Sequence, residues 1–296
     1  MARLDGWLIL DKPVGPSSAQ AVARVKRALK PGKIGHGGTL DPLASGVLPL
    51  ALGEATKTVS YAMDALKVYR FAIKFGEARA TDDAEGEVTE TSPHRPATEA
   101  IRAALARFIG RIEQRPPDFS AIKRDGRRAY DLARAGQAPD LTPRQVEIHR
   151  LALLDRPAPD LAEFEVECGK GTYVRSLARD LARALGTVGH VAALRRTRVG
   201  RFGEADSIPL ATVEEIGYSP ALIGRIRPVA TVLDDIPALA VDESGATLLR
   251  QGRPLALPDT ASDLGSGIIR AMSGDRLIAL VRVTGREARA VRVFNL

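Results

Sequence analysis

A glycine-rich stretch near the N-terminus runs from Gly35 to Gly46 and reads Gly-His-Gly-Gly-Thr-Leu-Asp-Pro-Leu-Ala-Ser-Gly. Its four glycines allow backbone conformations that other residues avoid. Pro42 has the opposite effect, because its ring fixes φ and disfavours the right-handed helical region for Asp41. The one acidic residue of the stretch is therefore expected at a rigid corner of the chain.

Two interpretations of Asp41 follow from this corner. An Asp-Pro pair can begin a short helix, with the aspartate as N-cap and the proline at the first helical position. That helix has no need of the glycines around it. We therefore favour the second interpretation, in which the corner presents the carboxylate of Asp41 to a functional site.

The composition of the 296-residue chain bounds its class. With 45% hydrophobic residues the chain can bury a substantial core, as one large domain or as a main domain with a smaller one. A net charge of +7 favours a polyanionic partner such as a nucleic acid, although an ordinary basic protein has the same balance. Cys168 is the only cysteine and the four histidines lack metal-ligand spacing, so we expect no disulfide and no metal site.

The ends and the apolar runs bear on location. The first residues lead directly into a strand-like segment and show no signal peptide. No apolar run reaches the length of a membrane span. We therefore expect a cytoplasmic protein that does not contact a membrane.

Hydrophobic periodicity predicts alternating strands and helices up to about residue 230. Strands are expected at 7–10, 47–52, 68–75, 146–154 and 161–168, with the last two paired. Helices are expected after a cap at Ser17 or Ser18, and at 59–66, 98–108 and 176–185. Short strands and turns follow, with a hairpin at 276–284 and 288–294. This change of character predicts a domain of residues 1–230 and a β-rich module of residues 231–296.

Three charged segments have no clear periodicity. The acidic segment 80–96 fails the calcium-loop spacing, so we interpret it as a solvated loop. The basic segment 115–128, followed by a short helix at 129–135, and the basic patch 189–198 are plausible phosphate-contacting surfaces. Solvated charge runs have the same composition, so both interpretations stay open.

A second glycine turn precedes the helix expected at 176–185. It is no phosphate-binding P-loop, because Phe164 stands where the first glycine belongs and Gly171 where Ser or Thr should follow the lysine. What remains is a turn that delivers Tyr173 and Arg175, which share one face at strand spacing. Arg175 either pairs with a buried carboxylate or is simply exposed.

Two further residues have alternative interpretations. Tyr69 stands among cations on a predicted strand, as in a base-stacking surface, but half-buried strand tyrosines are common. Lys12 lies in a turn, where it either contacts phosphate or is an ordinary exposed lysine.

Taken in order, these motifs resemble those of the B-type pseudouridine synthases, the family of the bacterial tRNA pseudouridine-55 synthases. The resemblance implies an α+β fold: a mixed, mainly antiparallel sheet flanked by helices, followed by a small PUA-like β-barrel that binds RNA. The matching residues run through most of the chain and are Asp11-Lys12-Pro13, His36 to Gly46, Tyr69-Arg70, Ser120 to Lys123, Gly169 to Arg175 and Leu194-Arg195-Arg196.

The resemblance also implies an activity. Members of the family isomerise uridine 55 in the T-loop of tRNA, detaching the base and rejoining it through carbon, without cofactor or metal. The implied partner is the T-arm of tRNA, bound by a monomer with no obligatory protein partner.

Site residues carry over by position in the motifs. Asp41 matches the catalytic aspartate, Tyr69 the tyrosine that stacks on the flipped base, and Arg175 the arginine that pairs with the aspartate. Such a pair would keep Asp41 ionised in a pocket that otherwise favours its neutral form. The free-energy cost of extruding a base is lowered by an aromatic ring that stacks on it and by a side chain that fills the space it leaves in the RNA. The implied substrate-binding residues are His36, which fills the space left by the base, Tyr173, Leu194 as an apolar wall, and Lys12.

Two alternatives compete with this hypothesis. One is a tRNA-binding or tRNA-folding protein without catalysis, for which Asp41 would be dispensable. The other is a pseudouridine synthase for another RNA, such as a guide-RNA-dependent relative, although the compact length favours a stand-alone enzyme. A glycosidase is remote, because no second carboxylate is placed beside Asp41.

Overall fold

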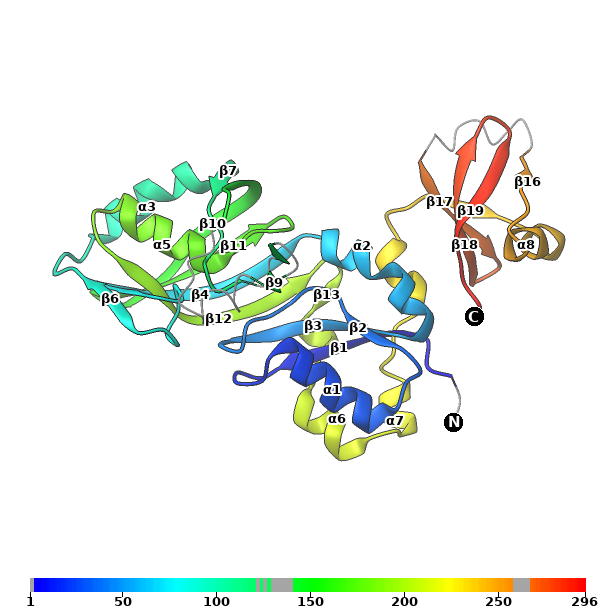
Figure 1. Ribbon diagram of the computed structural model, residues 1–296, viewed down its shortest axis with the longest axis horizontal. Coiled ribbons are helices and arrows are strands. Elements are labelled where there is room, and N and C mark those ends of the chain that lie inside the picture. The colour runs from blue at the N-terminus through cyan, green and yellow to red at the C-terminus, as the bar shows by residue number, and fades with distance from the viewer. Residues whose placement is uncertain (1–2, 121–122, 125–126, 129–140, 258–266) are drawn as a thin grey trace.

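The computed structural model describes residues 3–120, 123–124, 127–128, 141–257 and 267–296, with backbone only for 123–124 and 127–128. A large part built on one long sheet is followed by a smaller C-terminal part, drawn in orange and red in Figure 1. The helix predicted at 129–135 lies outside the described residues.

The larger sheet has ten strands and confirms the mixed, mainly antiparallel arrangement. Parallel pairs occur where β3 meets β12 and where β1 meets β14. The main path, in spatial order, is β14 (Ile208–Pro209), β1 (Gly6–Lys12), β3 (Ala44–Leu52), β12 (Gly189–Val199), β4 (Lys67–Phe75), β11 (Leu161–Cys168), β10 (Arg144–Ala158) and β7 (Gly110–Gln114). Off this path, β2 (Ile34–His36) pairs with β3 and β13 (Phe202–Gly203) pairs with β12.

Helices cover this sheet in two groups (Figure 1). The first helix, α1 (Ser18–Leu29), is capped by Ser17, which forms a reciprocal capping box with Gln20. It packs near α6 (Leu210–Ile216) and α7 (Pro220–Ile223). The second group contains α3 (Thr98–Leu105), extended by η2 (Ala106–Phe108), and α5 (Val174–Ala184), with α3 contacting β10 and α5 contacting β12. The expected helices are thus confirmed, together with α2 (Val59–Asp64), which follows η1 (Gly53–Thr58).

The glycine-rich stretch contains the end of β2, the start of β3 and the turn that connects them. Asp41 lies in this turn, whose closing bond runs from the amide of Ala44 to the carbonyl of Asp41 at 3.0 Å. No helix begins here, so the N-cap interpretation of Asp41 is wrong. Gly46 has a φ of +100°, and a Cβ on it would lie 2.2 Å from the carbonyl oxygen of Arg196. A glycine is therefore required where β3 runs alongside β12.

The start of α5 differs from the sequence prediction. Tyr173 is the N-cap residue and Arg175 already lies in the first helical turn. The two side chains therefore do not share one face of a strand. The glycine turn before them is shorter than expected, so the helix begins two residues earlier.

The C-terminal part is a five-stranded curled sheet, as expected for a PUA-like module. Its hairpin, β18 (Arg276–Thr284) and β19 (Glu287–Val293), confirms the predicted one. Helix α8 (Glu243–Arg250) packs on the sheet over a small apolar core. The remaining strands are β15 (Ala238–Ala240), β16 (Leu255–Ala256) and β17 (Ile268–Ser273).

The two sheets meet at a shared apolar cluster that includes Trp7, Phe202 and Phe294. Polar contacts join them as well: Lys57 Nζ donates to the carbonyl of Val293 at 2.8 Å. The segment η4 (Val229–Leu233) spans the predicted boundary at residue 230 and packs in the same cluster. The division into 1–230 and 231–296 stays a prediction.

Two charged segments differ from their sequence interpretation. Segment 80–96 is not a solvated loop throughout, because Asp83 is 3% exposed and the strand β6 (Val88–Thr91) within it pairs with β5 (Glu77–Arg79), which precedes it. Segment 189–198 is strand β12 and forms no free basic patch, since Arg196 is buried and Arg195 and Arg198 are paired with carboxylates. In the third segment the short strands β8 (Lys123–Arg124) and β9 (Arg127–Arg128) pair. None of the described helices is long and apolar enough to cross a membrane.

Candidate active site

A cavity of about 580 Å³ opens beside the glycine-rich turn. Its walls come from that turn, from α2, from β4 and β12, and from the segment that leads into α5. Five of the residues proposed from the sequence line this one cavity: Asp41, Tyr69, Tyr173, Arg175 and Leu194. Tyr173, Arg175 and Leu194 are 132 to 153 positions away from Asp41 in the chain, so only the fold brings them to the same cavity. Tyr69 is nearer in sequence, at 28 positions.

Asp41 and Arg175 form an ion pair at the cavity wall, with 2.9 Å between Oδ2 and Nη2. The carboxylate is 34% exposed, whereas the guanidinium is 4% exposed. This confirms that Arg175 pairs with a carboxylate rather than lying exposed. The exposed side of Asp41 faces a cavity large enough for a nucleotide base, while its other side is fixed by the buried arginine.

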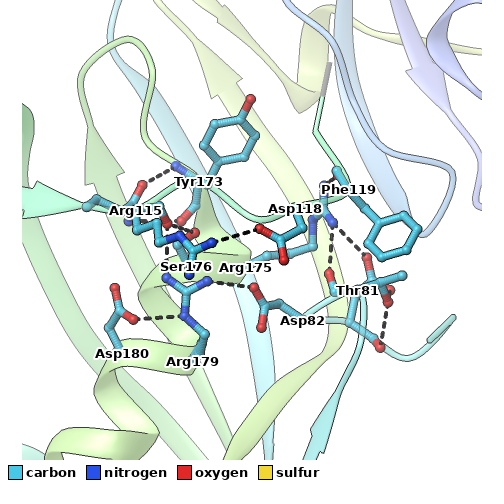
Figure 2. A network of polar contacts seen from close by, with 12 residues as sticks. Thr81, Asp82, Arg115, Asp118, Phe119, Tyr173, Arg175, Ser176, Arg179 and Asp180 are labelled. Carbon is cyan, nitrogen blue, oxygen red and sulfur yellow. Dashed lines mark hydrogen bonds and ion pairs between the residues drawn. The ribbon is translucent and has the colours of Figure 1, made fainter. Parts of the chain in front are cut away.

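Arg175 is held by three further groups behind the cavity. Its Nη1 donates to the carbonyl of Thr81 at 2.8 Å and its Nη2 to the carbonyl of Phe119 at 2.9 Å (Figure 2). A second carboxylate, Asp83, lies 3.5 Å from Nη1 and is as buried as the arginine. Asp83 is not predicted from the sequence, because the acidic segment 80–96 has the composition of a solvated loop. The signal available in the sequence was the adjacent pair of acids, Asp82 and Asp83, in a segment that lacks the periodicity of a surface element.

Tyr69 presents its ring to the cavity from β4. The ring is half-buried, and burial raises the pKa of its hydroxyl. The guanidinium carbon of Arg196 lies 6.0 Å from the ring centroid. Since neighbouring strand residues point to opposite faces, Arg70 lies on the other side of the sheet, where it pairs with Glu165 at 3.1 Å.

Tyr173 is fixed at the cavity rim by its own backbone. Its amide donates to Gln114 Oε1 at 2.7 Å, and Gln114 Nε2 donates back to its carbonyl at 3.1 Å. The guanidinium carbon of Arg144 lies 4.9 Å from the centroid of the tyrosine ring. Leu194 contributes a buried apolar wall from β12.

Lys12 and His36 lie close to the turn but are not among the described residues that line the cavity. Lys12 is 0% exposed, so its interpretation as an ordinary exposed lysine is wrong. Its ammonium donates to the carbonyls of Pro13 and Pro16 at 2.8 Å and reaches that of Pro42 at 3.5 Å. Burial lowers its pKa to about 8. The ammonium is therefore turned toward the backbone next to Asp41.

His36 ends β2 and is half-buried. Burial, and then the nearby charge of Arg196, lower the pKa of its imidazole. Its Nδ1 is buried without a hydrogen-bond partner among the described residues. The ring is thus a neutral, largely apolar body beside the turn.

Two buried cations near the cavity were not identified from the sequence. Arg196 is 1% exposed and donates to the carbonyls of Val47 at 2.8 Å, Gly38 at 3.0 Å and Thr39 at 3.3 Å, which lie on both sides of Asp41. Lys67 lines the cavity and donates to the carbonyls of Met63 and, at 2.6 Å, Ala65. Burial lowers the pKa of Lys67 to about 8. From the sequence, Arg196 is expected only as a member of the basic patch 189–198 and of the matching motif Leu194-Arg195-Arg196, with no role in shaping the turn.

The arrangement suits chemistry on a neutral, planar ligand. It offers the arginine-paired carboxylate of Asp41, two aromatic rings and an apolar wall, on a frame held by buried cations. Among the described residues, no three His, Cys, Asp or Glu side chains are grouped as metal ligands would be.

Comparison with protein families gives three matches in sequence. Residues 26–174 match the TruB family pseudouridylate synthase N-terminal domain. Residues 175–234 match the tRNA pseudouridylate synthase B C-terminal domain, and residues 236–295 match the tRNA pseudouridine synthase II C-terminal domain.

Similar proteins and structures agree with these matches. The chain is 55% identical to the tRNA pseudouridine synthase B of Bradyrhizobium diazoefficiens, covering 98% of the chain and 86% of that protein. It is 53% identical to that of Caulobacter vibrioides, covering 99% and 97%. A solved H/ACA RNP bound to a substrate RNA containing 2′-deoxyuridine contains a chain that is 26% identical, with a TM-score of 0.74 over 98% of this chain and 85% of that one. A Cbf5-Nop10-Gar1 complex gives 29% identity and a TM-score of 0.73 over 98% and 84%.

Proposed function

Because the chain belongs to the TruB family of tRNA pseudouridine synthases, which are isomerases, we propose that it acts on uridine 55 in the T-loop of tRNA and that Asp41 is its catalytic residue. The observation that carries the proposal is the ion pair between Asp41 and Arg175 at the wall of the cavity. A carboxylate with one side fixed by a buried arginine and the other open to a ligand suits a reacting group.

The isomerisation needs no co-reactant. The bond between N1 of uracil and C1′ of the ribose breaks, and a bond between C5 and C1′ forms. A proton leaves C5 and one is taken up at N1, so atoms and charges balance. Asp41 acts on the target nucleotide in its ionised form, which Arg175 stabilises.

The target base must leave the stack of the folded T-loop to reach the cavity. Unstacking costs a few kcal/mol, and stacking on an aromatic side chain returns about 1–3 kcal/mol. Tyr69 supplies this ring, and Leu194 and Tyr173 supply the walls around it. His36, as a neutral body beside the turn, fills the space that the base leaves in the RNA. Lys12 acts through the turn, because its ammonium holds the carbonyls of Pro13 and Pro16 and reaches that of Pro42, the residue after Asp41.

Residues 231–296 act as an RNA-binding module in this proposal. Exposed arginines on its hairpin, such as Arg282 and Arg292, provide charge for phosphates. The enzyme works as a monomer without an obligatory protein partner, in the cytoplasm, on the T-arm of tRNA.

A guide-dependent synthase is the second candidate, because the two solved structures above are an H/ACA RNP bound to a substrate RNA and a Cbf5-Nop10-Gar1 complex. Those chains are 26% and 29% identical, whereas the tRNA enzymes are 53% and 55% identical over nearly the whole chain. The difference in identity favours tRNA as the substrate.

Pseudouridine mapping in an unmodified tRNA transcript tests the proposal. The wild type, Asp41→Asn and Asp160→Asn are compared; Asp160 is a matched acid that pairs with Lys74 at 2.6 Å, away from the cavity. We expect one modified T-loop uridine with the wild type and with Asp160→Asn, and none with Asp41→Asn. Full activity of Asp41→Asn would refute the assignment of Asp41, and modification at another uridine would refute the assignment of position 55.

A further inference from the structure

A second arginine lies one helical turn after Arg175 on α5. Arg179 and Arg175 are four residues apart and therefore project from the same face of the helix (Figure 2). Arg179 Nη1 donates to Asp82 Oδ2 at 2.8 Å, and its Nε donates to Asp180 Oδ1 at 2.9 Å. Its side chain is 14% exposed and that of Asp82 is 16% exposed, so this pair lies largely out of solvent.

The two arginines hold the same two segments of chain. Arg175 donates to the carbonyls of Thr81 and Phe119, whereas Arg179 donates to Asp82 and, at 2.9 Å, to the carbonyl of Arg115. Segments 81–83 and 115–119 are each bound twice, once by the arginine at the cavity and once by the arginine behind it. A shift of either segment away from Arg179 therefore also moves the groups that orient Arg175.

The backbone of Asp82 makes this link tight. Asp82 has a φ of +59°, in the left-handed region that aspartate tolerates better than most residues. Its carbonyl accepts from the amide of Val191 at 3.0 Å, which docks the loop on β12. The next residue, Asp83, approaches Arg175. Burial raises the pKa of Asp82 and the charge of Arg179 opposes this, so loss of Arg179 leaves a largely buried carboxylate unpaired.

We propose that Arg179 and Asp82 form a positioning pair for the isomerisation, which holds segments 81–83 and 115–119 so that Arg175 faces Asp41. This inference rests on the proposed function, because it takes Asp41 and Arg175 as the pair at the reacting centre. Neither Arg179 nor Asp82 is among the described residues that line the cavity. The pair therefore affects the rate of the chemical step and leaves tRNA binding unchanged.

A double-mutant cycle separates positioning from simple stability. Arg179→Gln, Asp82→Ala and the double variant are compared in kcat and KM for pseudouridine formation, with thermal unfolding measured in parallel. Each single variant is expected to lower kcat about tenfold with an unchanged KM. The double variant is expected to lower it no further than the slower single variant, because both remove one interaction.

Two more variants serve as controls. Asp82→Asn keeps an acceptor oxygen and tolerates the left-handed backbone, so we expect it to retain most of the wild-type kcat. Asp180→Asn removes the other carboxylate of Arg179 but leaves the contacts with Asp82 and Arg115, so its kcat should stay within about twofold of wild type.

A wild-type kcat in Arg179→Gln would overturn the inference. So would a double variant whose loss of kcat is the product of the two single losses, or losses of kcat that equal the fraction of unfolded protein. Asp41→Asn, assayed alongside, separates the two proposals. An inactive Asp41→Asn with a wild-type Arg179→Gln would refute the positioning pair alone, whereas a fully active Asp41→Asn would refute both.

Discussion

Basic side chains occupy two opposite environments around the large sheet. Lys12, Lys67, Arg175 and Arg196 lie beside the cavity and are at most 6% exposed. On the other side of β4, β10, β11 and β12, Arg70, Arg150 and Arg198 have side chains that are 44–61% exposed and pair with Glu165 or Glu167. The two sets have the same charge but different partners.

This difference shows which basic side chains determine the geometry of the site. Three of the buried cations, Lys12, Arg175 and Arg196, bind backbone carbonyls of loops that carry site residues, and removing one leaves buried acceptors unpaired at about 1–3 kcal/mol each. An exposed ion pair contributes about 0.2–1 kcal/mol and is screened by salt. We therefore expect substitutions in the buried set to change activity and stability, and those in the exposed set to change little.

The largest expected effect comes from Arg175→Ala. This change leaves Asp41 and Asp83 without their shared cation, and breaking a buried pair costs about 3–5 kcal/mol. If this free energy is added to the activation barrier of the isomerisation, the single-turnover rate falls by about 10³-fold. Arg150→Ala, from the exposed set, is the control and should change the rate little. A rate within tenfold of wild type for Arg175→Ala would contradict the distinction between the buried and the exposed set.

Arg196→Lys should come next in size. A lysine carries one ammonium and cannot reproduce the fork that reaches the carbonyls of Val47, Thr39 and Gly38. We predict a loss of about 2–3 kcal/mol in the free energy of unfolding, measured in urea, together with a slower reaction. Unchanged stability would show that the turn holds its shape without the clamp.

The two buried lysines predict a pH dependence. Burial lowers the pKa of Lys12 and Lys67 to about 8, so between pH 8 and their ordinary value of 10.5 the folded chain binds fewer protons than the unfolded chain. Their burial therefore opposes folding below pH 8, and this contribution is relieved as the pH rises toward 10.5. In a ¹³C NMR titration of the lysine Cε signals, two resonances should shift near pH 8 and vanish from that range in Lys12→Met and Lys67→Met. Titration of both near pH 10.5 would place them with the exposed set.

The smallest effect is expected for the exposed pair of Arg198 and Glu167, which are 2.7 Å apart. A double-mutant cycle to alanine should give a coupling energy of about 0.5 kcal/mol that decreases further in 0.5 M salt. A coupling above about 2 kcal/mol would remove the distinction between the two sets.

The same contrast explains what the sequence could and could not predict. Strands, the capped first helix and the C-terminal hairpin follow from local periodicity and turn residues, which the large sheet does not override. The pairing of Arg175 with a carboxylate and the placement of Asp41, Tyr69, Tyr173 and Leu194 on one cavity were anticipated because motif order had suggested them.

Burial of charge was not predictable in this way. Arg196 and Asp83 have the same neighbours in sequence as solvated charges, and only pairing between distant strands shows that they are inside. The turn at Asp41 likewise depends on β3, whose start at Ala44 leaves no room for a helix. Which charges a fold removes from water depends on contacts between residues more than a hundred positions apart.

The most direct test of the central claim is a crystal structure of Asp41→Asn bound to a tRNA T-arm. We predict that uridine 55 is extruded into the cavity, with its base on the ring of Tyr69 and its ribose beside residue 41, while Arg175 keeps its contacts with Thr81 and Phe119. A uridine that remains stacked in the T-loop, or one bound away from residue 41, would contradict it.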